Sequence, residues 1–309
     1  MKEETIYSFN GLYRDSFRVK GFKFGEGEKS VCIVGSLRGN EYQQIYVCSL
    51  LIKELKKLEE AGKIRQGKSI MVVSCGNPYS VNIKKRFWSI DNTDINRMFP
   101  GYDKGETTQR IAAGIFKQIK DYRYGIQFAS FYMPGHFVPQ VRIMKTGNEN
   151  VEMAKEFGLP FVVIHNPRPF DTATLNYNWQ IWDTFAFSIY TSSTEKINRK
   201  SARQGVDAVL AFLEKEKIID YENSQGCQSK VIDSNNFISV RTSSAGFMES
   251  LVQAGDVVIR GQVMAHVTEP LTGDIIQTVT APEDGIIAFE YDSPIVYQNT
   301  AAFKLIPLK

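Results

Sequence analysis

The chain has few of the residues that hold metals or form disulfides. It contains four cysteines and three histidines in 309 residues. The cysteines, Cys32, Cys48, Cys75 and Cys227, have no paired spacing, which argues against a disulfide framework and against a cysteine zinc site. Cys32 and Cys48 lie in apolar patterns and are expected to be small core side chains. This use of cysteine favours a reducing, cytoplasmic location.

Long apolar runs and an excess of one charge are also absent. No run approaches the roughly 18 apolar residues of a membrane-spanning helix, and residues 1–12 have no apolar core of the signal-peptide kind. The net charge of +3 gives no reason to expect nucleic acid or a membrane as a partner. With 43% hydrophobic and 23% charged residues, the composition is that of a globular protein with a sizeable core.

The first two-thirds of the chain alternate strand-like apolar runs with amphipathic helical segments. Helices are expected at residues 41–61, 107–120 and 199–215, where apolar side chains recur with the helical period. This alternation predicts an α/β domain whose sheet is at least partly parallel and has helices on both faces. The expected strands are residues 30–35, 69–74, 125–131, 138–144, 161–164 and 186–191.

The character of the chain changes near residue 221. Residues 221–234 lose the helical period and begin with the polar stretch 221–226, so we predict a linker there. From residue 235 onward, short apolar runs are separated by turns such as Ala254-Gly255-Asp256, a spacing typical of a small all-β barrel or sandwich. The predicted domains are therefore residues 1–220 and 235–309.

Three polar motifs lie in the first domain. Residues 35–41, Gly-Ser-Leu-Arg-Gly-Asn-Glu, join the first buried strand to the first helix. Asn77-Pro78 follows the next strand, and Arg86 precedes the run 94–101, Asp-Ile-Asn-Arg-Met-Phe-Pro-Gly. A guanidinium can bind a carboxylate through two hydrogen bonds, and an Asn beside it adds a donor and an acceptor. By themselves, though, Arg86 and the Asn96-Arg97 pair are more typical of a solvated basic run and a capped turn.

Together the motifs resemble those of the succinylglutamate desuccinylase/aspartoacylase family of zinc carboxypeptidase-like deacylases. The family's first motif is Gly-x-x-His-Gly-Asn-Glu, and its later run is Asp/Asn-Leu-Asn-Arg-x-Phe-Pro-Gly. The resemblance covers nearly the whole chain. It implies a zinc-carboxypeptidase-like mixed sheet flanked by helices, followed by a small biotinyl/lipoyl-like β barrel. It also implies that Asn96 and Arg97 hold a substrate carboxylate, and that Arg86 stabilises the oxyanion formed when an amide is hydrolysed.

The chain departs from the family at the metal. The resemblance places three zinc ligands at the positions of Arg38, Glu41 and Ala129, and only Glu41 is of the family's type. One ligand is too few for a tight catalytic zinc site. The guanidinium of Arg38 would pair with Glu41 and repel a dication. We therefore expect no metal, with Arg38 replacing the charge of the zinc ion and contacting the substrate.

The remaining chemical groups are less closely defined by the resemblance. Tyr190 falls where the family has its catalytic Glu, although the match is loose, and Glu195 is an alternative that could equally begin the next helix. His136 is a weak substitute for a lost zinc ligand, and His165 could also face the site. His266 is expected to be structural. The hairpin tip at residues 271–274 has no Lys, so no lipoyl or biotin attachment is expected.

Three hypotheses about function follow. The first is a divergent family member that binds a small carboxylate or an N-acyl amino acid, with no cofactor and without the catalytic zinc site. The second is a zinc-dependent N-acyl amino acid deacylase whose metal is held by displaced ligands. The third is a structural or regulatory partner protein with a vestigial pocket. A homo-oligomer is compatible with all three.

Overall fold

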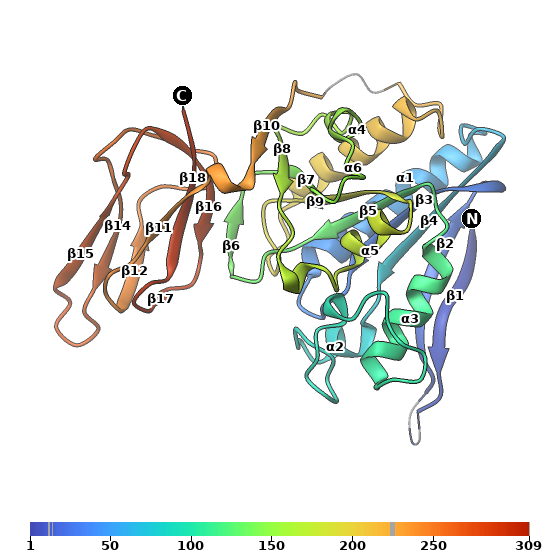
Figure 1. Ribbon diagram of the computed structural model, residues 1–309, viewed down its shortest axis with the longest axis horizontal. Coiled ribbons are helices and arrows are strands. Elements are labelled where there is room, and N and C mark those ends of the chain that lie inside the picture. Colours follow the sequence, from blue (N-terminus) through green and yellow to red (C-terminus); the bar gives the residue numbers. More distant parts are fainter. Residues whose placement is uncertain (12, 14, 223–225, 309) are drawn as a thin grey trace.

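The computed structural model describes residues 1–309 except for 12, 14, 223–225 and 309. Within that range, a nine-stranded mixed sheet runs through the larger part of the molecule, in the order β1-β2-β4-β3-β5-β9-β7-β8-β10 (Figure 1). Its strands are β1 (Lys2–Phe9), β2 (Phe17–Phe24), β3 (Gly27–Ser36), β4 (Gly67–Cys75), β5 (Tyr124–Ala129), β7 (Gln140–Met144), β8 (Phe161–His165), β9 (Phe185–Tyr190) and β10 (Lys230–Asp233).

The centre of this sheet is parallel. β3 pairs in parallel with both β4 and β5, and β5 pairs in parallel with β9. In this register Ala129, at the end of β5, lies opposite Tyr190, at the end of β9. The segments that follow β3, β5 and β9 therefore leave the sheet at the same edge. In open α/β sheets this carboxyl edge is where ligands bind.

Helices cover both faces of the sheet. α1 (Tyr42–Glu60) and α6 (Arg199–Lys215) pack on one face, and α3 (Thr107–Ile119) and α5 (Leu175–Ile181) pack on the other. Side chains alternate across a strand, and β3 shows the result. Val31 and Ile33 belong to the core under α1 and α6, while Cys32 and Val34 belong to the core under α3. The predicted sheet with helices on both faces is confirmed.

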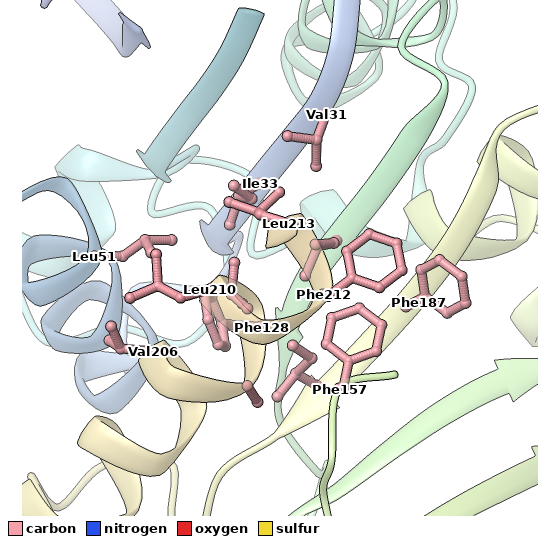
Figure 2. Close-up of a cluster of buried hydrophobic side chains, with 14 of the residues drawn as sticks. Val31, Ile33, Leu51, Phe128, Phe157, Phe187, Val206, Leu210, Phe212 and Leu213 are labelled. Carbon is pink, nitrogen blue, oxygen red and sulfur yellow. The ribbon is translucent and has the colours of Figure 1, made fainter. Parts of the chain in front are cut away.

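Aromatic side chains fill the core under α6. The rings of Phe157 and Phe212 are stacked with centroids 4.3 Å apart, and Phe187 lies 5.2 Å from Phe157 (Figure 2). Leu51 from α1 and Leu210 from α6 lie in the same cluster. Such fully buried side chains contribute about 1.5–3 kcal/mol each to folding, so this cluster holds α1 and α6 firmly on the sheet.

The C-terminal part is a separate sandwich of short strands, as the resemblance implied. One sheet has the order β11-β18-β16-β13 and the other β15-β14-β12-β17. Their inner faces share a core that includes Val267, Phe303 and Leu305. The strands are β11 (Ile238–Arg241), β12 (Gly246–Ser250), β13 (Val257–Val258), β14 (Val263–Thr268), β15 (Ile275–Thr280), β16 (Gly285–Tyr291), β17 (Ile295–Val296) and β18 (Ala301–Pro307).

A strand from the larger part joins this C-terminal module. β6 (Gly135–Phe137) pairs antiparallel with β16, with Phe137 opposite Phe289 (Figure 1). Val138 and Ala288 lie in a small apolar cluster beside this pairing. The module is therefore fixed to the α/β part by backbone hydrogen bonds as well as by side-chain packing.

Most expected elements are found within one or two residues of their predicted bounds. β1, β2 and β6 were not predicted. The predicted linker contains β10, which pairs in parallel with β8; part of the polar stretch, residues 223–225, lies outside the described residues. The domain boundary itself stays a prediction. The strand expected at 125–131 ends at Ala129, so residues 130 and 131 already belong to the loop next to the site. No helix in the described part of the chain has the length and apolar character needed to cross a bilayer.

Candidate functional site

A cavity of about 190 Å³ lies at the carboxyl edge of the sheet. Residues at the ends of β5 and β9 line it, together with Arg38 from the segment after β3. The short helical turns η1 (Ile95–Arg97) and η2 (Pro169–Asp171) form further walls. Lys304 of β18 also lines the cavity, so the C-terminal module contributes to it. A cavity of this size fits a ligand about as large as an amino acid derivative.

Arg38 lies behind this cavity between two carboxylates. Its Nη1 atom is 3.0 Å from Glu41 Oε1, and its Nη2 atom is 2.9 Å from Asp94 Oδ2. The Nε–H also donates to both oxygens of Asp94, at 3.1 and 3.0 Å. The exposed fraction is 5% for Arg38 and 1% for Glu41. A guanidinium fork with two carboxylates is a rigid, charge-assisted arrangement.

Local backbone geometry holds Glu41 in place. Its Oε2 atom accepts hydrogen bonds from the backbone N–H groups of Leu37 and Arg38, at 2.9 and 3.0 Å. Its Oε1 atom accepts from the hydroxyl of Ser130, just after β5. Gly39 allows the tight turn, because a Cβ there would lie 2.2 Å from the carbonyl oxygen of Lys85. Backbone and side-chain donors thus hold both oxygens of the Glu41 carboxylate.

The charges of this group reinforce one another. Burial alone would lower the pKa of Arg38, but the carboxylates of Glu41 and Asp94 outweigh burial and raise that pKa above its usual value. Arg86 behaves differently, since burial and the nearby charge of Arg38 lower its pKa. Arg38 is therefore a permanent cation whose charge is already compensated by two partners.

The expected carboxylate-binding pair, Asn96 and Arg97, lines the cavity. Asp94 caps η1 by accepting from the N–H of Asn96. Arg97 Nη1 donates to the Phe170 carbonyl and to Asp171 Oδ1, the latter at 3.3 Å. Its guanidinium lies over the ring of Phe170, 5.0 Å from the centroid. Arg97 is therefore held in position but already has one carboxylate partner.

His165 lies on the far wall of the cavity, paired with Asp171. Its Nε2 atom is 2.9 Å from Asp171 Oδ2, and its Nδ1 atom is 3.2 Å from the hydroxyl of Ser234. Burial lowers the pKa of His165 despite this partner. Burial raises the pKa of Asp171, but the hydrogen bonds from His165 and from the Arg168 N–H outweigh it and lower the pKa to about 2. Asp171 therefore stays ionised at neutral pH.

Three cations that no motif indicated also face the cavity: Arg142, Arg168 and Lys304. They come from β7, from the loop before η2 and from β18. Arg142 donates to the Tyr190 hydroxyl at 3.3 Å, so Tyr190 is at the site as expected. Lys304 lies in the C-terminal module, where local sequence carries no signal of its position.

Other expected residues lie outside the cavity lining. Arg86 is at its edge, where it donates to the Phe131 carbonyl at 3.4 Å. Glu195 accepts a hydrogen bond from the Asn40 amide at 2.6 Å. His136 lies on β6, the strand that joins the module, and its Nε2 atom is 3.3 Å from Asp292 Oδ2. His266 is 3.4 Å from the hydroxyl of Thr278 on the neighbouring strand.

Comparison with known proteins agrees with this architecture. Residues 27–214 match the model of the succinylglutamate desuccinylase/aspartoacylase catalytic domain. The chain belongs to the succinylglutamate desuccinylase/aspartoacylase family. A curated relative, the N-alpha-acetyl-L-2,4-diaminobutyric acid deacetylase of Halomonas elongata, is 24% identical over 288 residues, which cover 86% of this chain and 78% of that protein.

Solved structures share the fold over almost the whole chain. A succinylglutamate desuccinylase from Silicibacter sp. TM1040 has a TM-score of 0.82 at 17% identity, covering 98% of this chain and 92% of that one. A product-bound ectoine utilization protein from Ruegeria pomeroyi has a TM-score of 0.79 at 18% identity, with 95% and 90% covered. The predicted carboxypeptidase-like fold with its C-terminal β module is therefore confirmed.

The residues that the resemblance aligns with the family's zinc ligands, Arg38, Glu41 and Ala129, do not fit a zinc ion. A catalytic zinc site uses three protein ligands. Glu41 offers a carboxylate, but a guanidinium and the methyl group of Ala129 have no lone pair to give. Arg38 already takes one oxygen of Glu41. In the portion of the chain that the structure describes, no three His, Cys, Asp or Glu side chains are grouped so that they could hold a metal ion.

Proposed function

We propose that this chain binds a small carboxylate or an N-acyl amino acid in the cavity, and that Arg38 takes the place of the family's zinc. The observation that carries this proposal is the buried Arg38 guanidinium between Glu41 and Asp94. A zinc ion bound at Glu41 Oε1 would have to displace the charge-assisted hydrogen bonds that Arg38 and Ser130 donate to that oxygen. The carboxylate of the ligand would contact Asn96 and Arg97, which stay in the cavity wall.

A zinc-dependent deacylase with displaced ligands is the second candidate. The name of the Halomonas elongata relative, a deacetylase, favours it. In that case a metal would have to draw ligands from side chains that lie apart in the described residues, such as Glu41 and His165. The two candidates differ in a measurable quantity, the zinc content of the protein.

Metal analysis of protein purified without a histidine tag separates them. Under the proposal, the wild-type protein holds well under one zinc per chain after exposure to zinc and desalting. The double variant Arg38→His, Ala129→His restores two imidazoles beside Glu41 and should gain about one zinc per chain, as three ligands suffice. Stoichiometric zinc in the wild-type protein would refute the proposal.

Ligand binding needs its own test. N-acetyl-L-alanine carries one carboxylate and one amide and should raise the melting temperature of the wild-type protein, because a ligand that binds only the folded state stabilises it. Arg97→Ala should remove most of this shift. If no N-acyl amino acid or simple carboxylate stabilises the protein, and Arg97→Ala changes nothing, a structural or regulatory role is favoured.

A further inference from the structure

The charges around the cavity are not balanced. Arg38 pairs with Glu41 and Asp94, and Arg97 pairs with Asp171. Of the described residues that line the cavity, Asp171 is the one acidic side chain, and His165 shares it. The other cations in that wall are therefore compensated only by solvent or by a ligand.

Arg142, Arg168 and Lys304 have none. Among the described residues, no carboxylate forms an ion pair with any of the three. They come from three separate elements and line the same cavity. Arg168 is exposed to solvent, whereas Arg142 and Lys304 are half-buried, so repulsion between these two is screened least. Uncompensated cations that converge on a cavity are a signature of a bound anion.

The effect of this crowding is visible at Lys304. Burial, together with the positive charges of Arg142, Arg168 and Arg241, lowers its pKa to about 8. The ammonium group also lies over the ring of Phe131, 5.2 Å from the centroid. An anion bound beside Lys304 would raise the pKa of its ammonium group back toward the ordinary value.

Several buried polar atoms in the same wall have no protein partner among the residues that the structure describes. The Nε–H of Arg142 and both amide atoms of Asn176 make no hydrogen bond, and Asn176 is only 2% exposed. Leaving a buried donor unpaired costs about 1–3 kcal/mol, so these atoms are expected to find a partner in a ligand. The Oε1 atom of Gln140, also unpaired, offers an acceptor for a ligand N–H group.

We propose that Arg142, Arg168, Lys304 and Asn176 form a subsite for a phosphoryl group. The ligand is then a small phosphorylated carboxylate, with its carboxylate at Asn96 and Arg97. This assignment rests on the proposed function and narrows its ligand class. A phosphoryl group carries about −1.5 to −2 charges at pH 7 and three terminal oxygens, which suits three cations arriving from different directions. A single planar carboxylate would leave most of this positive charge uncompensated.

Calorimetric titration of the full-length protein with N-acetyl-O-phospho-L-serine tests the subsite. The comparison ligands are N-acetyl-L-glutamate, whose second carboxylate takes the place of the phosphoryl group, and N-acetyl-L-alanine, which has only its α-carboxylate. The phosphoryl compound should bind at least about 10-fold more tightly than N-acetyl-L-glutamate. Arg142→Met and Arg168→Met should each lower the affinity for the phosphoryl compound by about 10-fold or more, because charge-assisted hydrogen bonds are lost. Neither variant should lower the affinity for N-acetyl-L-alanine.

Arg241→Met is the matched control. Arg241 is exposed and acts on Lys304 only through its charge, and it does not line the cavity, so the affinity should stay within about 2-fold of wild type. Equal affinity for the phosphoryl compound and N-acetyl-L-glutamate would overturn the subsite while leaving the proposed function intact. Failure of all three ligands, in wild-type protein that melts cooperatively, would overturn both.

Discussion

At the scale of single residues, Arg38, which the resemblance aligns with a metal ligand of the family, is buried between two carboxylates. Removing the charge leaves Glu41 buried without a cation. Breaking a buried pair in this way typically costs about 3–5 kcal/mol, so Arg38→Met should lower the free energy of unfolding by that amount. Urea unfolding followed by circular dichroism measures it.

Two comparisons separate this effect from ordinary surface electrostatics. Arg203→Met removes an ion pair with Glu54 whose arginine is 51% exposed, and it should cost no more than about 1 kcal/mol. Adding Glu41→Gln to Arg38→Met removes the stranded charge and should recover part of the loss. An Arg38→Met protein as stable as wild type would contradict the assigned role.

His165 gives the site a pH dependence. Its pKa lies below the ordinary 6.5 because of burial, so the unfolded chain takes up a proton before the folded protein does. The contribution of His165 to the free energy of unfolding should therefore decrease as the pH falls below about 6.5. The contribution of Asp171, whose pKa is lowered to about 2, is complete above pH 3.8 and disappears only toward pH 2. Between pH 8 and pH 5 Glu156 acts in the opposite sense, because burial and Glu216 raise its pKa to about 7, so the effect of His165 has to be measured as a difference between two proteins.

Unfolding free energies measured across that range in wild type and in His165→Asn test the assignment. The free-energy difference between wild type and His165→Asn should shrink as the pH falls below 6.5, whatever its size at pH 8, because Glu156 titrates in both proteins and His165 only in one. Parallel profiles for the two proteins would show that His165 is not the group that titrates.

At the scale of elements, the strand β6 is what fastens the C-terminal module. A Cβ atom at Gly135 would lie 2.2 Å from the Glu290 carbonyl oxygen on β16. Gly135→Ala should therefore push the two strands apart and lower the free energy of unfolding by about 1–3 kcal/mol. His136→Ala, one residue along, keeps the backbone pairing and removes a partly exposed ion pair, so its effect should be below about 1 kcal/mol. Equal losses in the two variants would argue against a role for the strand pairing.

A helix or strand could be predicted from the sequence only where a periodic apolar pattern lies within the element itself. The helix at 199–215 was found to the residue, because Val206, Val209, Leu210 and Leu213 recur on one face. β1 was missed because its residues, Lys-Glu-Glu-Thr-Ile-Tyr-Ser-Phe, are mostly exposed at the sheet edge, where no apolar pattern is required. β6 was missed because three residues carry no period.

The residues of the site also fall into those that a local motif could indicate and those that only the fold brings together. Glu41, Asn96 and Arg97 belong to motifs that are contiguous in the chain, so a resemblance could indicate them. Arg168 and Lys304 belong to no motif, and they meet only because the module returns to the edge of the sheet. Arg38 illustrates both cases: its place in the motif was readable, but its second partner, Asp94, depends on the fold. Long-range contacts of this kind have no local signature.

At the scale of the whole molecule, the small net charge of +3 conceals a strongly positive cavity that the α/β part and the C-terminal module build together. Lys304 reaches the cavity only when the module is docked, and Phe289 is part of that docking contact, packed against Phe131 with centroids 5.4 Å apart. Phe289→Ala should therefore weaken the binding of N-acetyl-O-phospho-L-serine although Phe289 does not line the cavity. Its cost in stability should be about 3–5 kcal/mol.

Val279→Ala provides the comparison, because Val279 is buried in the core of the module away from the docking contact. It should destabilise the protein while leaving the affinity of the folded protein within about 2-fold of wild type, since the cavity keeps its shape. Titration calorimetry at a temperature where both variants are folded measures the difference. If Phe289→Ala binds the phosphoryl compound as tightly as Val279→Ala does, docking of the module does not shape the cavity, and Lys304 has no part in the subsite.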